Sequence, residues 1–408
     1  MTGQELNYKK FDAVVCLSAI DWDFLWQRTQ EIMSQFAAMG YPVLFVENTG
    51  VRNPGLRDLP RVGNRLAKLL MVKKPSADEQ SNESHHNISV LSPFALPFPY
   101  SKIAVNVNSH LLQSKLQQFS REVNVPINRI LLWSYMTTPL AINLAKSFSW
   151  AGVVVDLVSD PCKVAGAESL VGSHQEMLEL ADIILCASTS TAETAKEYLQ
   201  KPGYGRLHLF EDGFSTRLYE MAANETEELD LPLYNPNYPV VAYIGGVNDK
   251  IWWDAVSAMA TDFPEINFVF VGPKAYDKLP CAGAGKNVIW LPPFKRYAQL
   301  GSFLKKCSAG LIPYVPTPYV REMRPAKINE YMVMGLPIVA TRMPELERLD
   351  WQHGLGIVYL AESTNDIVDA LKHGLEEDRQ ELITKRREIV DRRSWEQVCK
   401  ELEIYLNR

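Results

Sequence analysis

Several features are missing from this 408-residue sequence, and each absence excludes a class of protein. No stretch approaches the ~20 consecutive apolar residues that a membrane-spanning helix needs. The first residues lack the apolar run of a secretory signal peptide. The net charge is −6, so the surplus of cations that is typical of general nucleic-acid binders is also missing. We therefore expect a cytoplasmic protein, soluble or peripherally attached, without a nucleic-acid partner.

Metal-binding patterns are missing as well. The six cysteines are scattered, with no C-x-x-C pair and no histidine at ligand spacing. This usage is typical of a reduced, cytosolic chain and gives no sign of a structural zinc site. The seven histidines contain no H-E-x-x-H pattern. The sequence therefore predicts neither a metal ion nor a cofactor.

Short apolar runs that alternate with segments of helical periodicity make up most of the chain. Such alternation predicts βαβ units and doubly wound parallel sheets. A polar, proline-containing stretch at 224–239 interrupts the pattern, which then restarts. Two domains follow, 1–225 and 236–393, with a last amphipathic helix at 394–408. The expected strands lie at 14–17, 43–47, 88–91, 130–133, 153–158, 183–187, 207–210, 240–244, 266–271, 288–291, 310–314 and 337–340.

Ligands of open α/β sheets bind beyond the carboxyl ends of the strands, so residues that follow strands are candidates. The G-x-G-x-x-G fingerprint and the P-loop pattern are absent. Gly245 and Gly246 follow the first strand of the second domain, where a glycine pair permits close backbone approach to a ligand. A plain tight turn explains the same pair equally well.

Residues 321–341 carry the strongest candidate site. Pro325 suits the first position of a helix that runs to about Met334, and a helix N-terminus favours phosphate. Arg321, Arg324 and Lys327 cluster at this end and predict a pyrophosphate clamp. Glu330 lies one turn after Lys327, where its carboxylate suits a ribose diol. Glu322 precedes the helix. The alternative is a surface helix with solvated charges.

These residues carry a resemblance to a known family. Glu322 and Glu330 have E-x7-E spacing, and the segment from Lys327 to Val339 resembles the K-x-x-E-Y-x-x-x-G-x-P-V-V signature of GT-B glycosyltransferases. Residues 211–214 are similar to the N-G-V-D turn that closes the first domain of that family. Residues 394–396 resemble the S-W-E that begins its last helix. The stretch at 21–48 resembles bacterial polysaccharide-assembly glycosyltransferases of the teichuronic-acid and xanthan types.

The resemblance implies an α/β protein with the GT-B fold, built from two facing Rossmann-like doubly wound domains. It implies an acceptor-binding first domain, a second domain that holds a nucleotide-sugar, and a last helix that crosses back to the first. Glu330 would then bind the ribose, while the helix start and its cations would bind the diphosphate. Phe294, in the loop 293–296, would flank the nucleobase.

Displacement at an anomeric carbon needs a base for the attacking hydroxyl, and a carboxylate can serve. Asp160 ends the strand at 153–158 and resembles the catalytic aspartate of the xanthan-type enzymes, which favours an inverting reaction. A turn or cap role is the alternative for Asp160. Asp21 and Asp23 have the D-x-D spacing of metal-dependent glycosyltransferases, but they follow the first strand. With Arg28 they are predicted to bind the acceptor.

Residues 51–74 hold seven cations and one acid, so this segment carries +6 in an acidic chain. Arg57, Arg61, Arg65 and Lys68 share one helical face. Such a cationic amphipathic helix suits an anionic membrane surface or a phosphate-bearing lipid acceptor. An ordinary surface helix is the alternative.

The sequence thus predicts a glycosyltransferase that moves a sugar from a nucleotide-sugar donor to a glycan or lipid-linked acceptor in bacterial surface polysaccharide assembly. Its expected location is the cytoplasm, peripherally on the inner face of the cell membrane. The alternatives are a nucleotide-sugar epimerase or hydrolase of the same fold, and a nucleotide-sugar-binding protein without catalysis.

Overall fold

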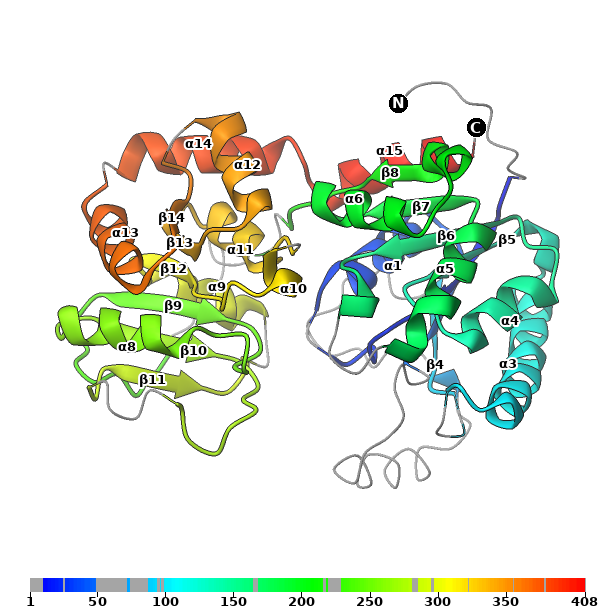
Figure 1. Cartoon of the computed structure of the whole chain (residues 1–408), viewed down its shortest axis with the longest axis horizontal. Coiled ribbons are helices and arrows are strands. Elements are labelled where there is room, and N and C mark those ends of the chain that lie inside the picture. Colours follow the sequence, from blue (N-terminus) through cyan, green and yellow to red (C-terminus); the bar gives the residue numbers. More distant parts are fainter. Residues whose placement is uncertain are drawn as a thin grey trace. The chain divides into compact units, whose positions relative to one another are not determined.

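The computed structural model describes most of the chain, and the chain divides into two compact units (Figure 1). The described residues are 10–24, 26–48, 72–73, 87–93, 96, 99–163, 168–215, 218, 229–280, 285–294, 297–321, 323–354, 356–377 and 379–407. Unit 1 comprises Met1–Glu211 and Glu396–Arg408, and unit 2 comprises Asp212–Trp395. The first passage between the units therefore lies before the polar stretch that the sequence indicated. The basic segment 51–74 falls outside the described residues except for 72–73.

Unit 1 contains an eight-stranded sheet in the order β3-β4-β2-β1-β5-β6-β7-β8. All pairings are parallel except that between β3 and β4. Strands β1, β2, β5, β6 and β7 are buried throughout, which explains why their residues are mainly apolar. The strands are β1 (Ala13–Leu17), β2 (Val43–Val46), β3 (Val72–Lys73), β4 (Ile88–Leu91), β5 (Ile130–Ser134), β6 (Gly152–Leu157), β7 (Ile183–Cys186) and β8 (Leu207–Leu209).

Helices cover the sheet of unit 1, and the last of them comes from the end of the chain. Tyr41 donates a hydrogen bond to Glu403 of this last helix, and Tyr405 contacts His208. The unit 1 helices are α1 (Arg28–Ala38), α3 (Lys102–Glu122), α4 (Pro139–Ser147), α5 (Val171–Leu180), α6 (Thr189–Glu197) and α15 (Trp395–Leu406). Among the residues that the structure describes, no helix has the length and apolarity needed to cross a membrane.

Unit 2 contains a six-stranded parallel sheet in the order β11-β10-β9-β12-β13-β14. Numbered along the unit, this order is that of a Rossmann sheet, and its order reverses between β9 and β12. The strands are β9 (Val240–Ile244), β10 (Asn267–Val271), β11 (Val288–Leu291), β12 (Ala309–Ile312), β13 (Ile338–Thr341) and β14 (Tyr359–Ala361). The helices are α8 (Trp253–Asp262), α9 (Tyr297–Lys305), α10 (Pro318–Arg321), α11 (Lys327–Val333), α12 (Pro344–His353), α13 (Thr364–Glu376) and α14 (Arg379–Asp391).

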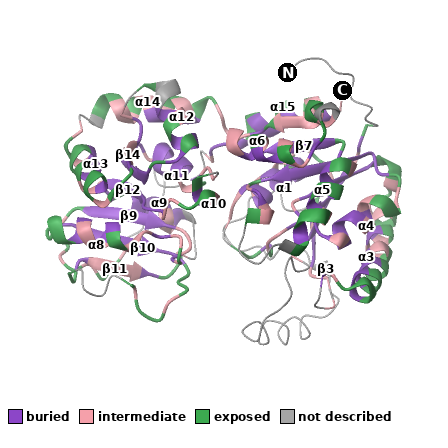
Figure 2. Ribbon diagram, viewed as in Figure 1, coloured by how far each residue is buried: buried purple, intermediate pink, exposed green. Residues whose placement is uncertain are grey.

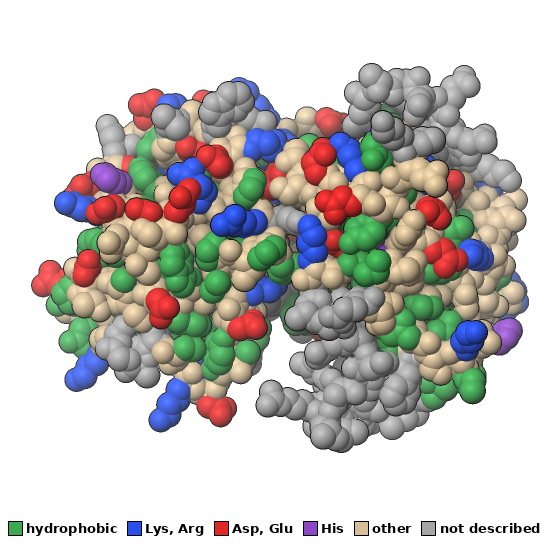
Figure 3. All heavy atoms as spheres, viewed as in Figure 1, with side chains coloured by type: hydrophobic (Ala, Val, Ile, Leu, Met, Phe, Trp, Pro, Cys, Tyr) green, Lys and Arg blue, Asp and Glu red, His purple; other side chains and the backbone are tan. Residues whose placement is uncertain are grey.

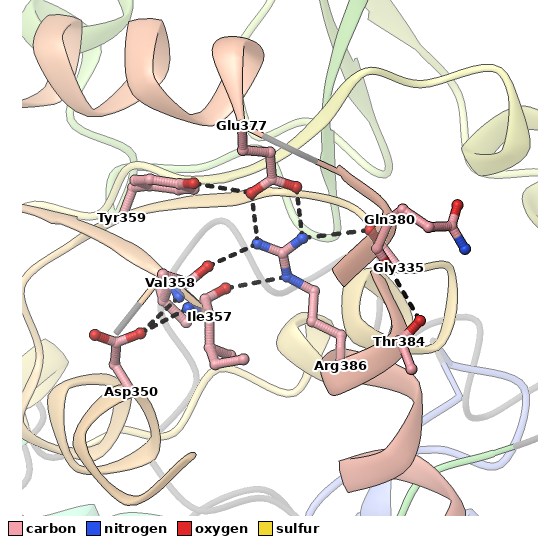
Figure 4. A network of polar contacts seen from close by, with 10 residues as sticks. Gly335, Asp350, Ile357, Val358, Tyr359, Glu377, Gln380, Thr384 and Arg386 are labelled. Carbon is pink, nitrogen blue, oxygen red and sulfur yellow. Dashed lines mark hydrogen bonds and ion pairs between the residues drawn. The ribbon is translucent and has the colours of Figure 1, made fainter. Parts of the chain in front are cut away.

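The strands of both sheets form the buried centre of each unit, and the exposed residues lie mainly on the helices and loops (Figure 2). In unit 2 a buried ion pair holds the last helices onto the sheet. The Arg386 guanidinium donates two hydrogen bonds to the Glu377 carboxylate, at 2.7 and 2.9 Å, and both side chains are at most 1% exposed. Arg386 also donates to the carbonyls of Gly335, Gly356 and Ile357 (Figure 4).

The two chain passages that join the units lie side by side in unit 2. Phe214 forms a parallel bridge with Ser394, and the Trp395 amide donates to the Phe214 carbonyl at 3.0 Å. A side chain on Gly213 would come within 2.7 Å of the Trp395 Cα, so only glycine fits there. The two short motifs at 211–214 and 394–396 therefore pair with each other.

Candidate functional site

The switch point of the unit 2 sheet brings three glycines together. Gly245 and Gly246 follow β9, and Gly272 follows β10. Gly245 has a φ of +121° and Gly272 a φ of +148°, which side-chain-bearing residues rarely adopt. A Cβ on Gly272 would lie 2.0 Å from the Gly245 carbonyl oxygen. The close approach of the two turns therefore requires glycine at the carboxyl ends of β9 and β10.

Lys327 stands next to this glycine turn. Its ammonium lies 3.4 Å from the place where a Gly245 Cβ would be. The same ammonium lies 4.1 Å from the Tyr243 ring centroid and 4.5 Å from that of Tyr314. It also donates a hydrogen bond to the Tyr314 hydroxyl. Two aromatic faces and one phenol oxygen thus hold this cation at the switch point.

The two tyrosines that hold Lys327 differ in their acidity. Burial raises the pKa of the Tyr314 phenol, but the charge and hydrogen bond of Lys327 outweigh it, so the pKa lies below its usual value. The pKa of Tyr243 is raised, first by burial and then by Tyr314. The Tyr243 hydroxyl donates to the Gly246 carbonyl at 2.8 Å. Tyr243 therefore links the glycine turn to the cation, and neither tyrosine was identified from the sequence.

The helix that carries Lys327 differs from the sequence-based expectation. It begins at Lys327 rather than at Pro325 and ends at Val333. The amides of Ile328 and Asn329 already donate to the carbonyls of Pro325 and Ala326. The expected row of open helix N–H groups is therefore partly used by the preceding tight turn, and the role of Lys327 in binding an anion stays a prediction.

The other predicted donor-binding residues differ in their exposure to solvent. Arg321 is exposed at the end of α10, while Arg324 and Glu330 are half-buried. Glu322 lies outside the described residues. Phe294 packs against Phe303, with ring centroids 5.4 Å apart, and is partly buried on the core of unit 2. The roles of all five residues in donor binding stay predictions.

Tyr331, the residue after Glu330, attaches α11 to the sheet through buried contacts. Its hydroxyl donates to the Ala242 carbonyl at 2.9 Å and accepts from the Ile244 amide at 3.1 Å. A Cβ on Gly310 of β12 would lie 2.4 Å from the Tyr331 ring, so glycine makes room for it. The neighbouring Asn329 amide donates to the Gly213 carbonyl at 3.0 Å. These buried contacts fix α11, and therefore Lys327 and Glu330, against the sheet.

Asp160 of unit 1 lies in a buried polar cluster just after β6. One carboxylate oxygen accepts a hydrogen bond from the Cys162 amide at 2.8 Å. The other accepts from the Tyr198 hydroxyl at 3.0 Å. Asp160 is 2% exposed. The hydrogen bond from the Cys162 amide, two residues further along the chain, is typical of an aspartate that caps a short turn. These contacts support the structural alternative, and the base role stays a prediction.

The neighbours of Asp160 are a thiol and an imidazole. Burial, with the Asp160 charge as second cause, raises the pKa of the Cys162 thiol to about 11. Burial lowers the pKa of His174 to about 4, against the opposing effect of Asp160. Ligand atoms of Asp160, Cys162 and His174 lie within 4.8 Å of one another, the spacing of residues that can hold a metal ion. A metal would have to displace the thiol proton, since the thiolate is the ligand. The prediction of no metal stays untested.

Arg28 lies in a buried ion pair rather than on an open surface. It was predicted to bind the acceptor, but its side chain is 4% exposed and is paired with the fully buried Asp156 of β6. The Arg28 Nε donates to both Asp156 oxygens, at 3.0 and 3.1 Å, and the guanidinium lies 4.8 Å from the Phe210 ring centroid. This pair ties the start of α1 to the sheet. The sequence missed it because the partners are far apart along the chain.

The other predicted acceptor residues lie on an open loop. Asp21 and Asp23 are exposed, in the turn that joins β1 to α1. Between them, Trp22 is buried, and its amide donates to the Glu47 carboxylate at 2.9 Å. Trp22 thus anchors the loop while both carboxylates face solvent. Their acceptor role stays a prediction.

The sequence of this chain is similar to those of known glycosyltransferases. Residues 238–377, which contain the glycine turn, α11 and β14, match the family described as Glycosyl transferases group 1. A Bacillus subtilis protein described as the teichuronic acid biosynthesis glycosyltransferase TuaH is 24% identical over 276 residues. This match covers 59% of the chain and spans 66% of the length of that relative.

Several solved structures share the whole architecture. Sucrose-phosphate synthase from Thermosynechococcus elongatus superposes with a TM-score of 0.66 at 15% identity, over 96% of this chain and 98% of that one. Anabaena HepE in complex with UDP gives 0.63 at 12% identity, over 98% and 99%. An E. coli trehalose-6-phosphate protein bound with UDP-2-fluoro glucose gives 0.62 at 12% identity, over 97% and 99%.

The fold and the matched domain define a class, the glycosyltransferases of the GT-B type. The predicted fold and the resemblance to this family are therefore confirmed. Within that class, residues 238–377 of unit 2 match the glycosyl transferases group 1 family, and a curated Bacillus subtilis sequence to which the chain is similar is described for teichuronic acid biosynthesis.

Proposed function

We propose that this chain transfers a sugar from a nucleoside-diphosphate sugar to a hydroxyl acceptor during assembly of a bacterial surface polysaccharide. The observation that carries the proposal is the Lys327 ammonium, held beside the Gly245 turn at the switch point of a glycosyl transferases group 1 domain. Ligands of such sheets bind at this place, and a fixed cation there suits a diphosphate.

The chemistry assigns a task to each group. The acceptor oxygen attacks the anomeric carbon, and the bond from that carbon to the diphosphate oxygen breaks. The diphosphate leaves with the bonding electrons, and Lys327, with Arg321 and Arg324, offsets the charge that develops on it. Glu330 accepts hydrogen bonds from the ribose hydroxyls, and Phe294 lies beside the base. The acceptor proton passes to a carboxylate, for which Asp160 is the candidate.

Several findings support the donor class and the process. The Anabaena and E. coli neighbours are complexes with UDP or a UDP-sugar, and the Bacillus relative is described for teichuronic acid biosynthesis. The donor is therefore proposed to be a nucleoside-diphosphate sugar, and the acceptor a growing glycan or a lipid-linked one. A cytoplasmic location at the inner face of the membrane, without a metal or cofactor, completes the proposal.

The first experiment is a thermal-shift panel of nucleoside diphosphates and their sugar conjugates. A ligand at 100 times its dissociation constant stabilises the folded state by ~2.7 kcal/mol, which is readily measured. We expect one nucleoside diphosphate to raise the melting temperature, and Lys327→Met to abolish the rise. If no nucleotide or nucleotide-sugar shifts the wild-type transition, the donor assignment is wrong.

A further inference from the structure

Helix α3 of unit 1 has an exposed apolar strip. Ile103 is 76% exposed, Val107 38% and Leu111 43%, and these three residues are spaced four apart. At ~100° per residue they fall within ~80° of one another on the helix surface, along ~12 Å of its length. Scattered exposed aliphatic residues are ordinary, but three in register on one face are not.

The opposite face of α3 already has its partner. Leu112, Leu116 and Phe119 are at most 4% exposed and pack into the core of unit 1. The Asn108 side chain fixes the start of the helix through hydrogen bonds with the amide and carbonyl of Leu96, at 2.7 and 3.1 Å. The strip therefore is not needed to attach α3, and it faces away from the core.

The charge around the strip has one sign. The sequence from 84 to 121 contains Lys102, Lys115 and Arg121 and no aspartate or glutamate, although the whole chain has 48 acids in 408 residues. The polar residues exposed beside the strip include Lys102, Asn106, His110 and Ser114. In Figure 3, hydrophobic side chains reach the surface over α3, at the lower right. An aliphatic strip with the Lys102 ammonium beside it complements an anionic bilayer.

We propose that α3 is a membrane-docking helix, whose Ile103, Val107 and Leu111 insert into the interface of an anionic lipid bilayer. The strip is too small for a stable protein interface, which needs ~800 Å² from each partner. In a bilayer interface, by contrast, three aliphatic side chains and nearby cations act together. Lys102 lies next to Ile103, where its ammonium contacts lipid phosphates while its methylenes stay apolar. Helix α3 would then be a second membrane-binding element, besides the basic segment 51–74 that the sequence predicts.

The experiment is co-sedimentation of the full chain with phosphatidylcholine vesicles, with and without phosphatidylglycerol, at low and high salt. The test variant is Ile103→Gln/Val107→Gln/Leu111→Gln, because glutamine keeps the helix propensity. The matched control is Ile404→Gln, an aliphatic residue of α15 that is 54% exposed in the same unit. Thermal unfolding of each variant confirms that it folds.

We expect the wild-type chain and Ile404→Gln to pellet with anionic vesicles, and the triple variant to partition about tenfold less or weaker, most clearly at high salt where charge attraction is screened. Nucleotide binding by unit 2 should be the same in all three, which separates this inference from the proposed function. The inference is overturned if the wild-type chain does not pellet, or if the triple variant pellets as well as the wild type. Self-association that the triple variant abolishes would assign the strip to a second copy instead.

Discussion

Lys327 and Tyr314 form a hydrogen-bonded pair at the point where the strand order of the unit 2 sheet reverses. The ammonium of Lys327 also lies over the rings of Tyr243 and Tyr314, beside the glycine turn after β9. A lysine side chain normally loses much rotamer freedom when it binds an anion. Here the aromatic contacts already order it, so the proposed diphosphate would meet a preorganised cation.

Tyr314→Phe should weaken the binding of a nucleoside diphosphate by about tenfold or more, because a hydrogen bond to a charged group contributes ~1.5–3 kcal/mol. The ring that contacts Lys327 remains, so the loss should be smaller than that of Lys327→Met. Binding of the nucleoside without phosphates should not change. Isothermal titration calorimetry measures the binding of both ligands to the wild type, to Tyr314→Phe and to Lys327→Met. Tyr276→Phe, in the same unit, is the control. An equal loss for nucleoside and diphosphate would show general damage rather than a role in placing the cation.

Asp160→Asn should fold normally and bind the donor, because asparagine keeps an oxygen that accepts the Cys162 amide hydrogen bond. If Asp160 is the base, sugar transfer should fall by ~10²–10⁴-fold. Initial rates with a labelled donor give the answer. Tyr198→Phe is the control, since it removes the hydrogen bond from the Tyr198 hydroxyl and keeps the carboxylate. Near-wild-type transfer by the asparagine variant would assign Asp160 to the turn alone.

The expected fold agreed with the structure where local pattern determines it. Buried parallel strands read as apolar runs, so the strands at 240–244 and 130–133 were found almost to the residue. Gly245 and Lys327 were predicted from local signals, a glycine turn after a strand and a cation at a helix start, and the structure places them next to each other. Tyr314 was missed, although a tyrosine shortly after β12, the switch-point strand, was a usable signal.

The sequence could not show which charged residues are interior. Arg28 and Asp156 are 128 positions apart, and only the folded sheet brings them together. The same is true of Asp160 and Tyr198, whose contact depends on the approach of α6 to the loop after β6. A position after a strand predicts proximity to a site, whereas solvent access depends on neighbours that come from distant segments.

Stability should fall as the pH is lowered from about 6.5 to 4, owing to His174. Burial depresses the pKa of His174 to about 4, while in the unfolded chain it has its ordinary value of ~6.5. Between these values the unfolded state binds the proton more readily, so the stabilisation is complete above ~6.5 and is lost on acidification to 4, by up to ~3 kcal/mol. We expect the free energy of unfolding, measured with urea at several pH values in this range, to change less steeply with pH in His174→Gln than in the wild type. The control His110→Gln, which changes an exposed histidine, should keep the pH dependence of the wild type. The same pH dependence in the wild type and both variants would exclude His174 as the cause of the loss of stability.

Arg386→Met should lower the free energy of unfolding by ~3–5 kcal/mol, because it leaves the buried Glu377 carboxylate without its partner. The double variant Arg386→Met/Glu377→Leu should recover part of this loss, since no charge then stays buried. Lys385→Met is the control, because its pair with Glu381 is exposed to solvent and contributes little to stability. Chemical denaturation of each variant measures the difference. A loss as small as that of the control would show that the Arg386–Glu377 ion pair does not stabilise the fold.

The most direct test of the central claim is transfer of a labelled sugar. The purified chain is incubated with labelled nucleoside-diphosphate sugars and a glycan or lipid-linked acceptor fraction, and both products are quantified. We predict that label appears on the acceptor together with an equal amount of free nucleoside diphosphate, and that Glu330→Ala, which lacks the proposed ribose-binding carboxylate, transfers far less. Conversion or hydrolysis of the donor that does not depend on an acceptor, or binding of the donor without any turnover, would contradict the account.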